Sequence, residues 1–312
     1  MKFLEKVEIG NTGLKVTRLG LGGAFLANVG LSKAVAVVHR ALELGVGYID
    51  TAPLYGSSEV YIGEALSCMD REKYVISTKV GKRGGSVKVF DYSRDSIMRS
   101  MDESLKRLKI DRVDILFVHD PSSHPDGPEV GYRQVMDEAY PALIELRSHG
   151  VVRAFGAGMN EWEMPLRFAM NGDFDCFLMA GRYTLLDQSG LDELLPFCHR
   201  NGTGIIVGGP YNSGILASDL TESATYNYRE APPEILKKAR RIKSVCDRYQ
   251  VPLKAAALQF VLAHPAVTTV IPGVQSIPEL EENIHLLEYP ITKELWADLK
   301  EDGLLDKETP TP

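Results

Sequence analysis

Short apolar segments recur along the chain, separated by segments whose apolar residues lie three or four positions apart. The apolar segments are continuous rather than alternating with polar residues, which predicts strands of a parallel sheet buried on both faces. Eight segments have this pattern: residues 18–23, 48–52, 74–80, 113–120, 151–158, 176–182, 204–209 and 268–273.

The intervening segments have the period of amphipathic helices. Residues 32–45, 93–109 and 131–150 are predicted helices, with Ser32 and Ser93 as N-caps and with Gly45 and Gly150 as stops. The same period returns at residues 234–250, 253–264 and 277–287.

Eight strand-and-helix units in roughly 250 residues are what a (β/α)8 TIM barrel requires. The competing prediction is a doubly wound sheet, but no strand is followed by GxGxxG, and "GLGG" at 20–23 is only a fragment of that motif. Two alternating segments around "GNTG" predict a β-hairpin that plugs the N-terminal end of the barrel. We therefore expect one α/β domain over residues 1–312, with the hairpin at 1–17, the barrel at 18–290 and a C-terminal helix and tail at 291–312.

Composition narrows the class of protein. The chain is 44% hydrophobic and 25% charged, as in ordinary globular domains, and its net charge of -7 argues against binding to nucleic acid. The four cysteines, at 68, 176, 198 and 246, form no CxxC pair and no zinc spacing, so we expect reduced thiols and no metal site. No signal segment or apolar run of membrane-spanning length is evident, so we expect a cytoplasmic protein without a membrane partner.

Two long segments follow predicted strands at their carboxyl ends, where barrel enzymes build their sites. They are residues 121–131 and residues 210–233, the second carrying Tyr226 and Tyr228. Their length predicts binding loops or lids rather than simple connections.

Polar residues end three neighbouring predicted strands. Asp50, Lys79 and His119 stand at these ends, and Tyr55 lies in the loop after Asp50. Each has an ordinary structural explanation alone, as a cap, a solvated charge or a turn residue. Together at one mouth they indicate a functional site, because buried titratable groups are costly unless they are paired or used.

These residue types suit proton transfer by tyrosine. A phenol has a pKa near ~10, and a nearby cation such as Lys79 favours the phenolate. Asp50 is expected to keep Lys79 charged, and a neutral His119 can donate a hydrogen bond to a substrate oxygen. Such a site has no electron acceptor of its own and therefore needs a hydride carrier.

The segments at 45–66, 76–81, 111–121, 156–160, 208–216 and 271–283, which include "YIDTAPLYGSSE", "ISTKVG" and "GGPYNSGIL", together resemble the aldo-keto reductase superfamily over essentially the whole chain. Within it, "FDYSRDSIMRSMDESLKRL" and "AGRYTLLDQSGLDELLPFC" are most similar to bacterial aldose 1-dehydrogenases that act on L-fucose and D-threo-aldoses.

The resemblance implies oxidation of the anomeric C1 hydroxyl of an aldose to a lactone, with NAD or NADP and with a tetrad of Asp50, Tyr55, Lys79 and His119. The sugar is expected against Tyr55, His119, His124 and Trp162. Two alternatives remain: another small carbonyl or hemiacetal such as pyridoxal, and a cofactor-sensing binding subunit of low turnover. We expect a monomer or small homo-oligomer.

The resemblance also implies cofactor contacts, and the chain departs from many relatives at Met159, Ala180 and Gly208. The acidic residues Glu279, Glu281 and Glu282 predict NAD, because carboxylates repel the 2'-phosphate of NADP. The alternative is a solvated helix face, with a basic side chain arriving from elsewhere. The implied cofactor contacts are Gly23, Asp50, Asn160, Pro210, Tyr211, Asn212, Gly214, Leu216, Gly273, Glu279, Glu282 and Asn283.

Overall fold

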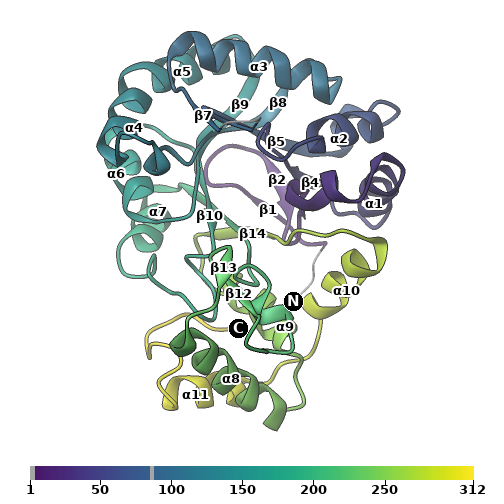
Figure 1. Ribbon diagram of the computed structural model, residues 1–312, viewed down its shortest axis with the longest axis vertical. Helices are drawn as coiled ribbons and strands as arrows, with labels where there is room; N and C mark the ends of the chain where they lie inside the picture. The colour runs from purple at the N-terminus through teal and green to yellow at the C-terminus, as the bar shows by residue number, and fades with distance from the viewer. Residues whose placement is uncertain (1–3, 85–87) are drawn as a thin grey trace.

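Parallel strands form the centre of the computed structural model, which describes residues 4–84 and 88–312 (Figure 1). The eight-stranded sheet has the order β14-β11-β10-β9-β8-β5-β4-β3, and bridges from Leu19 to Val270 and from Gly22 to Gly273 join its two edges into a barrel. Each predicted strand overlaps one observed strand, so the barrel prediction is confirmed over the doubly wound sheet. The strands are β3 (Leu21–Gly22), β4 (Tyr48–Asp50), β5 (Val75–Val80), β8 (Val113–His119), β9 (Val152–Met159), β10 (Cys176–Ala180), β11 (Gly204–Gly208) and β14 (Val267–Ile271).

Helices surround the barrel on its outside (Figure 1). Ser93 caps α3 as predicted, since its hydroxyl accepts from Ser96 N at 3.4 Å, but the Ser32 cap is wrong because α1 begins one residue earlier, after Gly30. The helices are α1 (Leu31–Glu43), α2 (Ser58–Leu66), α3 (Arg94–Leu108), α4 (Pro128–Gln134), α5 (Tyr140–Ser148), α6 (Glu163–Asn171), α7 (Leu194–Asn201), α8 (Pro233–Arg248), α9 (Leu253–Val261), α10 (Ile277–Leu287) and α11 (Lys293–Glu301).

Alternation along each strand divides the apolar side chains into two layers. One set fills the barrel interior and includes Tyr48, Ile115, Phe117 and Ile206, while a larger set packs between the strands and the helices. The side chains at alternate positions of β4, β5 and β8 therefore face inward, and the last inward positions carry Asp50, Lys79 and His119. The barrel thus presents polar groups at its carboxyl-end mouth above an apolar interior.

The N-terminal hairpin closes the opposite end, as predicted. Strands β1 (Lys6–Glu8) and β2 (Lys15–Thr17) pair antiparallel, and Ile9, Leu14 and Val16 are at most 2% exposed within the interior cluster. A Cβ on Gly10, which has a φ of +51°, would lie 2.5 Å from the carbonyl oxygen of Gly202, so the turn can approach the barrel only as glycine.

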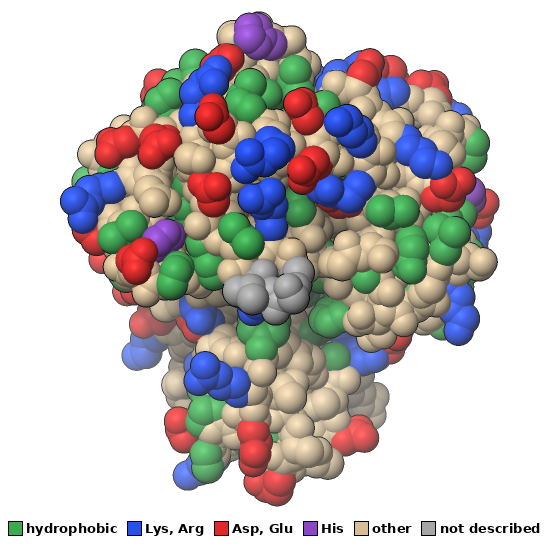
Figure 2. Space-filling view, turned by 45° about the horizontal axis from the view of Figure 1, so that its top comes forward, with side chains coloured by type: hydrophobic (Ala, Val, Ile, Leu, Met, Phe, Trp, Pro, Cys, Tyr) green, Lys and Arg blue, Asp and Glu red, His purple; other side chains and the backbone are tan. Residues whose placement is uncertain are grey.

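Two smaller hairpins stand at the mouth. Strands β6 (Lys82–Arg83) and β7 (Val89–Phe90) form one of them, and β12 (Thr225–Tyr226) and β13 (Arg229–Glu230) form the other, within the long segment after β11. Acidic and basic side chains are interspersed over the face shown in Figure 2. Across residues 4–84 and 88–312, no helix has the length and apolar character needed to span a membrane.

Candidate active site

A buried ion pair joins the ends of β4 and β5. Lys79 Nζ donates to Asp50 Oδ2 at 2.6 Å and to the Thr51 carbonyl at 2.8 Å, and both charged residues are at most 3% exposed. The second oxygen of Asp50 accepts from the Ser77 hydroxyl at 2.7 Å. Each charged atom of the pair therefore has a further hydrogen-bond partner or an ionic one, which a buried pair needs in order to be stable.

Tyr55 returns over this pair through the turn after β4, in which Tyr55 N donates to the Ala52 carbonyl at 3.0 Å. The Lys79 ammonium lies 4.8 Å from the centroid of the Tyr55 ring. The His119 ring meets the Tyr55 ring edge-on, with centroids 5.9 Å apart. The structure therefore brings the four residues of the expected tetrad together at one mouth.

The electrostatics at Tyr55 differ from the sequence-based expectation. Burial raises the pKa of the Tyr55 phenol well above its usual value of 10, and the Asp50 carboxylate raises it further. The lowering expected from Lys79 does not prevail, because the ammonium charge is largely compensated by Asp50 at 2.6 Å. Tyr55 therefore holds its proton at neutral pH in the free protein.

His119 is an uncharged imidazole at neutral pH. Its burial lowers its pKa to about 3, and its carbonyl accepts from the Tyr92 hydroxyl at 2.8 Å, which fixes the end of β8. Its Nδ1 is buried and has no hydrogen-bond partner among the described residues, while Nε2 lies 4.0 Å from Asp120 Oδ2. A neutral ring of this kind can donate one hydrogen bond to a substrate oxygen.

A second buried carboxylate supports β5 from outside the barrel. Glu59, only 1% exposed, accepts from the Thr78 hydroxyl and from Arg107 Nε, each at 2.6 Å. Thr78 precedes Lys79, so this network fastens β5 to α2 and α3. Glu59 was not among the predicted site residues, although "YGSSE" places an acid close to the tetrad.

Another buried ion pair lies beside His119. Lys82 Nζ donates to Asp120 Oδ2 at 2.8 Å, and Asn160 Nδ2 donates to Asp120 Oδ1 at 3.2 Å. The Tyr228 hydroxyl reaches from the β12–β13 hairpin to Asn160 Oδ1 at 3.3 Å. Neither Lys82 nor Asp120 was predicted as a site residue.

A cleft of about 510 Å³ extends from the tetrad along the ends of the strands. Of the expected cofactor contacts, it is lined by Asp50, Pro210, Tyr211, Gly214, Gly273, Glu279, Glu282 and Asn283. It is also lined by Gly22, Phe25, Tyr55, Tyr228, Lys254 and Gln275, of which Tyr55 was predicted as a site residue and Tyr228 as part of a binding loop. Gly23, Asn160, Asn212 and Leu216 are not among its lining residues.

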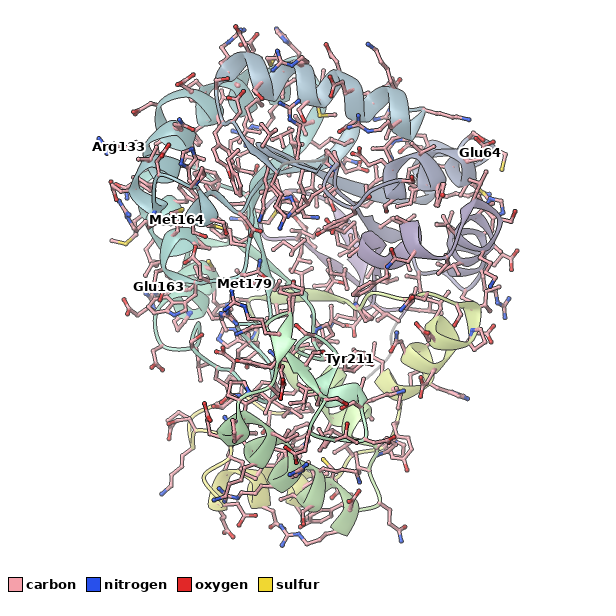
Figure 3. All side chains as sticks on the ribbon, viewed as in Figure 1. Glu64, Arg133, Glu163, Met164, Met179 and Tyr211 are labelled. Carbon is pink, nitrogen blue, oxygen red and sulfur yellow. The ribbon has the colours of Figure 1, made fainter. Side chains whose placement is uncertain are left out.

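The cleft fits an elongated, phosphate-bearing dinucleotide. Gly209, Asn212, Ser213 and Gly214 all have positive φ, so the backbone after β11 turns sharply in the way that forms concave anion sites. Tyr211, labelled in Figure 3, donates to Asn283 Oδ1 at 2.6 Å and so ties this turn to α10.

The acidic stretch of α10 is compensated by partners from other elements. Arg40 binds Glu281 at 2.8 Å, and Lys254 of α9 donates to both oxygens of Glu282 at 2.8 and 2.9 Å. Glu279 accepts from Gln275 N at 2.9 Å, and its own N donates to the hydroxyl of Ser276, the N-cap of α10, at 3.3 Å. The basic side chain from elsewhere is therefore present, and the acidic residues of α10 repel a 2'-phosphate less than the sequence indicated.

Of the four expected sugar contacts, Tyr55 and His119 belong to the tetrad, whereas His124 and Trp162 are not among the residues that line the cleft. His124 packs near the rings of Phe90 and Tyr92, with centroids 6.2 and 6.3 Å away, and it does not line the cleft. Trp162 is half-buried and directly precedes α6. It packs against Gly190, since a Cβ added to Gly190 would lie 3.6 Å from the Cβ of Trp162.

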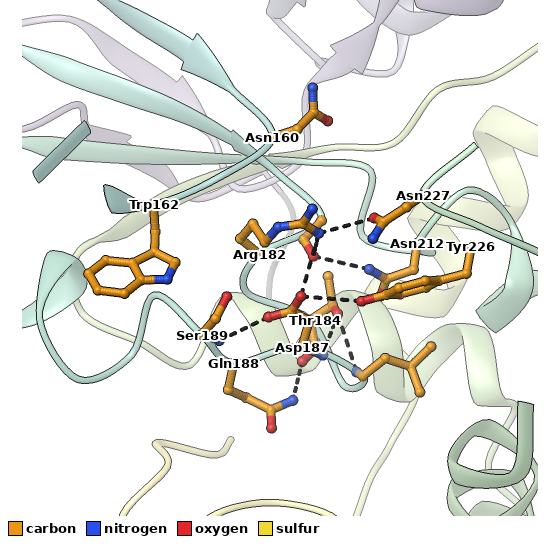
Figure 4. A network of polar contacts seen from close by, with 12 residues as sticks. Asn160, Trp162, Arg182, Thr184, Asp187, Gln188, Ser189, Asn212, Tyr226 and Asn227 are labelled. Carbon is orange, nitrogen blue, oxygen red and sulfur yellow. Dashed lines mark hydrogen bonds and ion pairs between the residues drawn. The ribbon is translucent and has the colours of Figure 1, made fainter. Parts of the chain in front are cut away.

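Figure 4 shows a polar network that joins the loop after β10 to the β12–β13 hairpin. Arg182 contacts Asp187 at 3.4 Å and Asn227 Oδ1 at 3.0 Å, and the Tyr226 hydroxyl donates to Asp187 at 3.2 Å. The hairpin that carries Tyr228 is thereby held against the cleft.

In the part of the chain that the structure describes, no group of three or more His, Cys, Asp or Glu side chains could hold a metal ion.

A parallel barrel with tyrosine, lysine, aspartate and histidine beside a dinucleotide-sized cleft defines a class of oxidoreductase. The chain belongs to the aldo/keto reductase family, whose model matches residues 18–302. It is 37% identical to a pyridoxal 4-dehydrogenase from Microbacterium luteolum, over 98% of this chain and 99% of that protein. It is 35% identical to a D-threo-aldose 1-dehydrogenase from a Pseudomonas species, over 96% and 97%. The holo form of an aldo-keto reductase from Bacillus halodurans superimposes with a TM-score of 0.80, at 29% identity and 95% coverage of both chains.

Proposed function

We propose that this protein oxidises the anomeric C1 hydroxyl of an aldose, of the L-fucose or D-threo type, to the lactone with NAD. The observation that carries the proposal is the buried Asp50–Lys79 pair beneath Tyr55 and His119 at one end of the cleft. The 35% identity to a D-threo-aldose 1-dehydrogenase supports the choice of substrate.

The proposed chemistry assigns one task to each side chain. The C1 hydroxyl lies between Tyr55 and His119, where neutral His119 donates a hydrogen bond to its oxygen and Tyr55 acts as the general acid/base that exchanges its proton. Lys79, held by Asp50, fixes the position of a positive charge beside the phenol. A nicotinamide dinucleotide bound in the cleft supplies the acceptor for the C1 hydride. Loss of that hydride and of the hydroxyl proton leaves a carbonyl, which is the lactone.

In this proposal, different residues of the cleft bind different parts of the dinucleotide. The turn at Pro210, Tyr211 and Gly214 suits the pyrophosphate, and Glu279, Glu282 and Asn283 suit the adenosine end. Asn160 is the proposed partner of the carboxamide. Gly23 supports the site indirectly, because a Cβ there would lie 2.6 Å from the Asp50 carbonyl oxygen.

Pyridoxal is the second candidate substrate. Its cyclic hemiacetal offers a carbon of the same type to the tetrad, and a pyridoxal 4-dehydrogenase is 37% identical to this chain. A cofactor-sensing subunit of low turnover is a poorer explanation, because the ionic and hydrogen-bonding partners that hold Asp50 and Lys79 beside Tyr55 are in place.

The test is a turnover assay with the purified protein, NAD or NADP, and a panel of L-fucose, other aldoses and pyridoxal. We expect NADH absorbance to increase with one or more aldoses and a lactone to be found by mass spectrometry. Turnover of pyridoxal alone would replace the proposal with the second candidate. Dinucleotide binding without turnover on any member of the panel would favour the sensor.

A further inference from the structure

Asp120 follows His119 directly and is a buried charge that the proposed proton transfer leaves unused. The residue is 5% exposed, and each of its oxygens has one side-chain donor, Lys82 on Oδ2 and Asn160 on Oδ1. An ionised carboxylate can accept about four hydrogen bonds, so each oxygen can accept another. Asp120 therefore has acceptor capacity for a ligand hydroxyl.

The site keeps this carboxylate at some cost. Lys82 and Asp120 are both nearly buried, and burying two charges is expensive even when they are paired at 2.8 Å. Asp120 also has a left-handed backbone, with a φ of +46°, which is uncommon outside glycine. Buried charged groups and strained backbone conformations are both more frequent at functional sites than elsewhere in proteins.

The position of Asp120 relative to His119 indicates which group of a bound substrate could donate a hydrogen bond to the Asp120 carboxylate. Asp120 Oδ2 lies 4.0 Å from His119 Nε2, and the ring is neutral, so this contact is not an ion pair. A reacting oxygen bound to His119 would be ~2.9 Å from the ring nitrogen. Oxygens on neighbouring carbons of a sugar are about one hydrogen-bond length apart, so the next hydroxyl can reach Asp120.

We propose that Asp120, held by Lys82, accepts a hydrogen bond from the hydroxyl on the carbon next to the reacting carbon, which is the C2 hydroxyl of an aldose. The inference rests on the proposed function and narrows it to substrates with that hydroxyl. Pyridoxal is disfavoured at this position, since the atom next to its hemiacetal carbon is a ring carbon without a hydroxyl. A hydrogen bond to a charged group is worth roughly a 10- to 100-fold change in kcat/KM.

The test compares L-fucose with 2-deoxy-L-fucose in the wild-type protein and in Asp120→Asn. Asparagine keeps the shape and an acceptor for Lys82 but removes the charge. We expect the wild-type protein to prefer L-fucose by at least ~10-fold in kcat/KM. In the variant we expect this preference to fall toward unity, because L-fucose loses most of its kcat/KM and the 2-deoxy sugar loses little. The quantity compared is the ratio of kcat/KM for L-fucose to kcat/KM for 2-deoxy-L-fucose, in the wild-type protein and in the variant. Differences in intrinsic reactivity between the two sugars affect both ratios equally and therefore cancel.

The matched control is Asp114→Asn, which alters a buried carboxylate paired with Arg71 at 2.7 Å in the first half of β8, away from the mouth. We expect it to leave the sugar preference unchanged. A variant that lowers kcat/KM equally for both sugars would overturn the inference and make Asp120 a positioning residue for Asn160. Equal use of both sugars by the wild-type protein would also overturn it, whether or not Asp120→Asn folds. If the protein oxidises no aldose at all, the proposed function itself fails, which is a separate outcome.

Discussion

At the residue scale, the partners of Lys79 decide how Tyr55 behaves. The ammonium is bound to Asp50 and to the Thr51 carbonyl, so the phenol faces a compensated charge rather than a free cation. Burial then dominates, and the pKa of Tyr55 rises well above 10. A neutral phenol is ready to give a proton, whereas oxidation requires it to take one.

This electrostatic state gives the first prediction. Because the phenolate becomes more abundant as pH rises, kcat/KM for oxidation should increase steadily between pH 7 and pH 10, and the reverse reduction should be favoured at lower pH.

Tyr55→Phe should lower kcat by at least ~10²-fold and remove the pH dependence, with NADH affinity changed little. Steady-state rates and fluorescence titration measure both quantities. Tyr249→Phe, a change at a tyrosine that bonds Asp298, is the control and should behave as wild type. Near-normal turnover of Tyr55→Phe would exclude the assigned role.

The second prediction concerns the choice of dinucleotide. Lys254 is held by Glu282 in the cleft, and in Glu282→Gln this cation should become available to a 2'-phosphate. We expect wild type to prefer NAD, and we expect the variant to gain roughly 10-fold in kcat/KM with NADP, the scale of one charge-assisted hydrogen bond. Glu281→Gln, whose partner is Arg40, is the matched control and should gain less. An NADP preference in the wild-type protein would contradict the proposed coenzyme.

At the element scale, the N-terminal hairpin contributes stability far from the chemistry. Leu14 is 1% exposed and packs with the residues of the barrel interior at the end opposite the mouth. Leu14→Ala should lower the free energy of unfolding by about 2–5 kcal/mol while leaving kcat/KM within about threefold. Urea unfolding and steady-state kinetics provide the two measurements. Leu4→Ala, at a side chain that is 53% exposed, should change neither. A large loss of activity in folded Leu14→Ala would mean that the plug and the mouth are coupled.

The observed strands and helices also show which elements can be predicted from the spacing of apolar residues in the sequence. The strands were predictable because buried parallel strands are continuous apolar segments, and α1, α3, α8 and α10 are long enough to show a full amphipathic pattern. The short helices α2, α6 and α7 have two or three turns, in which the period is harder to detect, although α9 of similar length was predicted. The predicted helix at 131–150 includes a π-helical segment at Val135–Ala139, which separates α4 from α5 without interrupting the apolar spacing in the sequence.

At the scale of the whole molecule, burial of His119 links stability to acidity. Its pKa is about 3 in the folded protein and near 6.5 when exposed, so the unfolded chain takes up a proton first as pH falls. The stabilisation is therefore complete above pH 6.5 and is lost progressively toward pH 3, at about 1.4 kcal/mol per pH unit.

His119→Gln removes this titration. Between pH 7 and pH 5 the free energy of unfolding of the variant should fall by about 1–2 kcal/mol less than that of wild type. Urea unfolding at the two pH values measures the difference. His149→Gln, at an exposed histidine, is the control and should follow wild type. Parallel pH dependence of wild type and His119→Gln would show that His119 is not buried in its neutral form.

The sequence by itself determined the barrel, the plugging hairpin and the strand-end positions of Asp50, Lys79 and His119. It could do so because strand period and burial are local properties, and because the ends of parallel strands meet at one mouth. Only the tertiary structure decided which charges neutralise one another. Lys254 reaches Glu282 from a different helix, Lys82 reaches Asp120 from the β6–β7 hairpin, and the burial of Tyr55 has a larger effect on its pKa than Lys79 has. Such pairings depend on distances between segments remote in the chain, which local pattern does not specify.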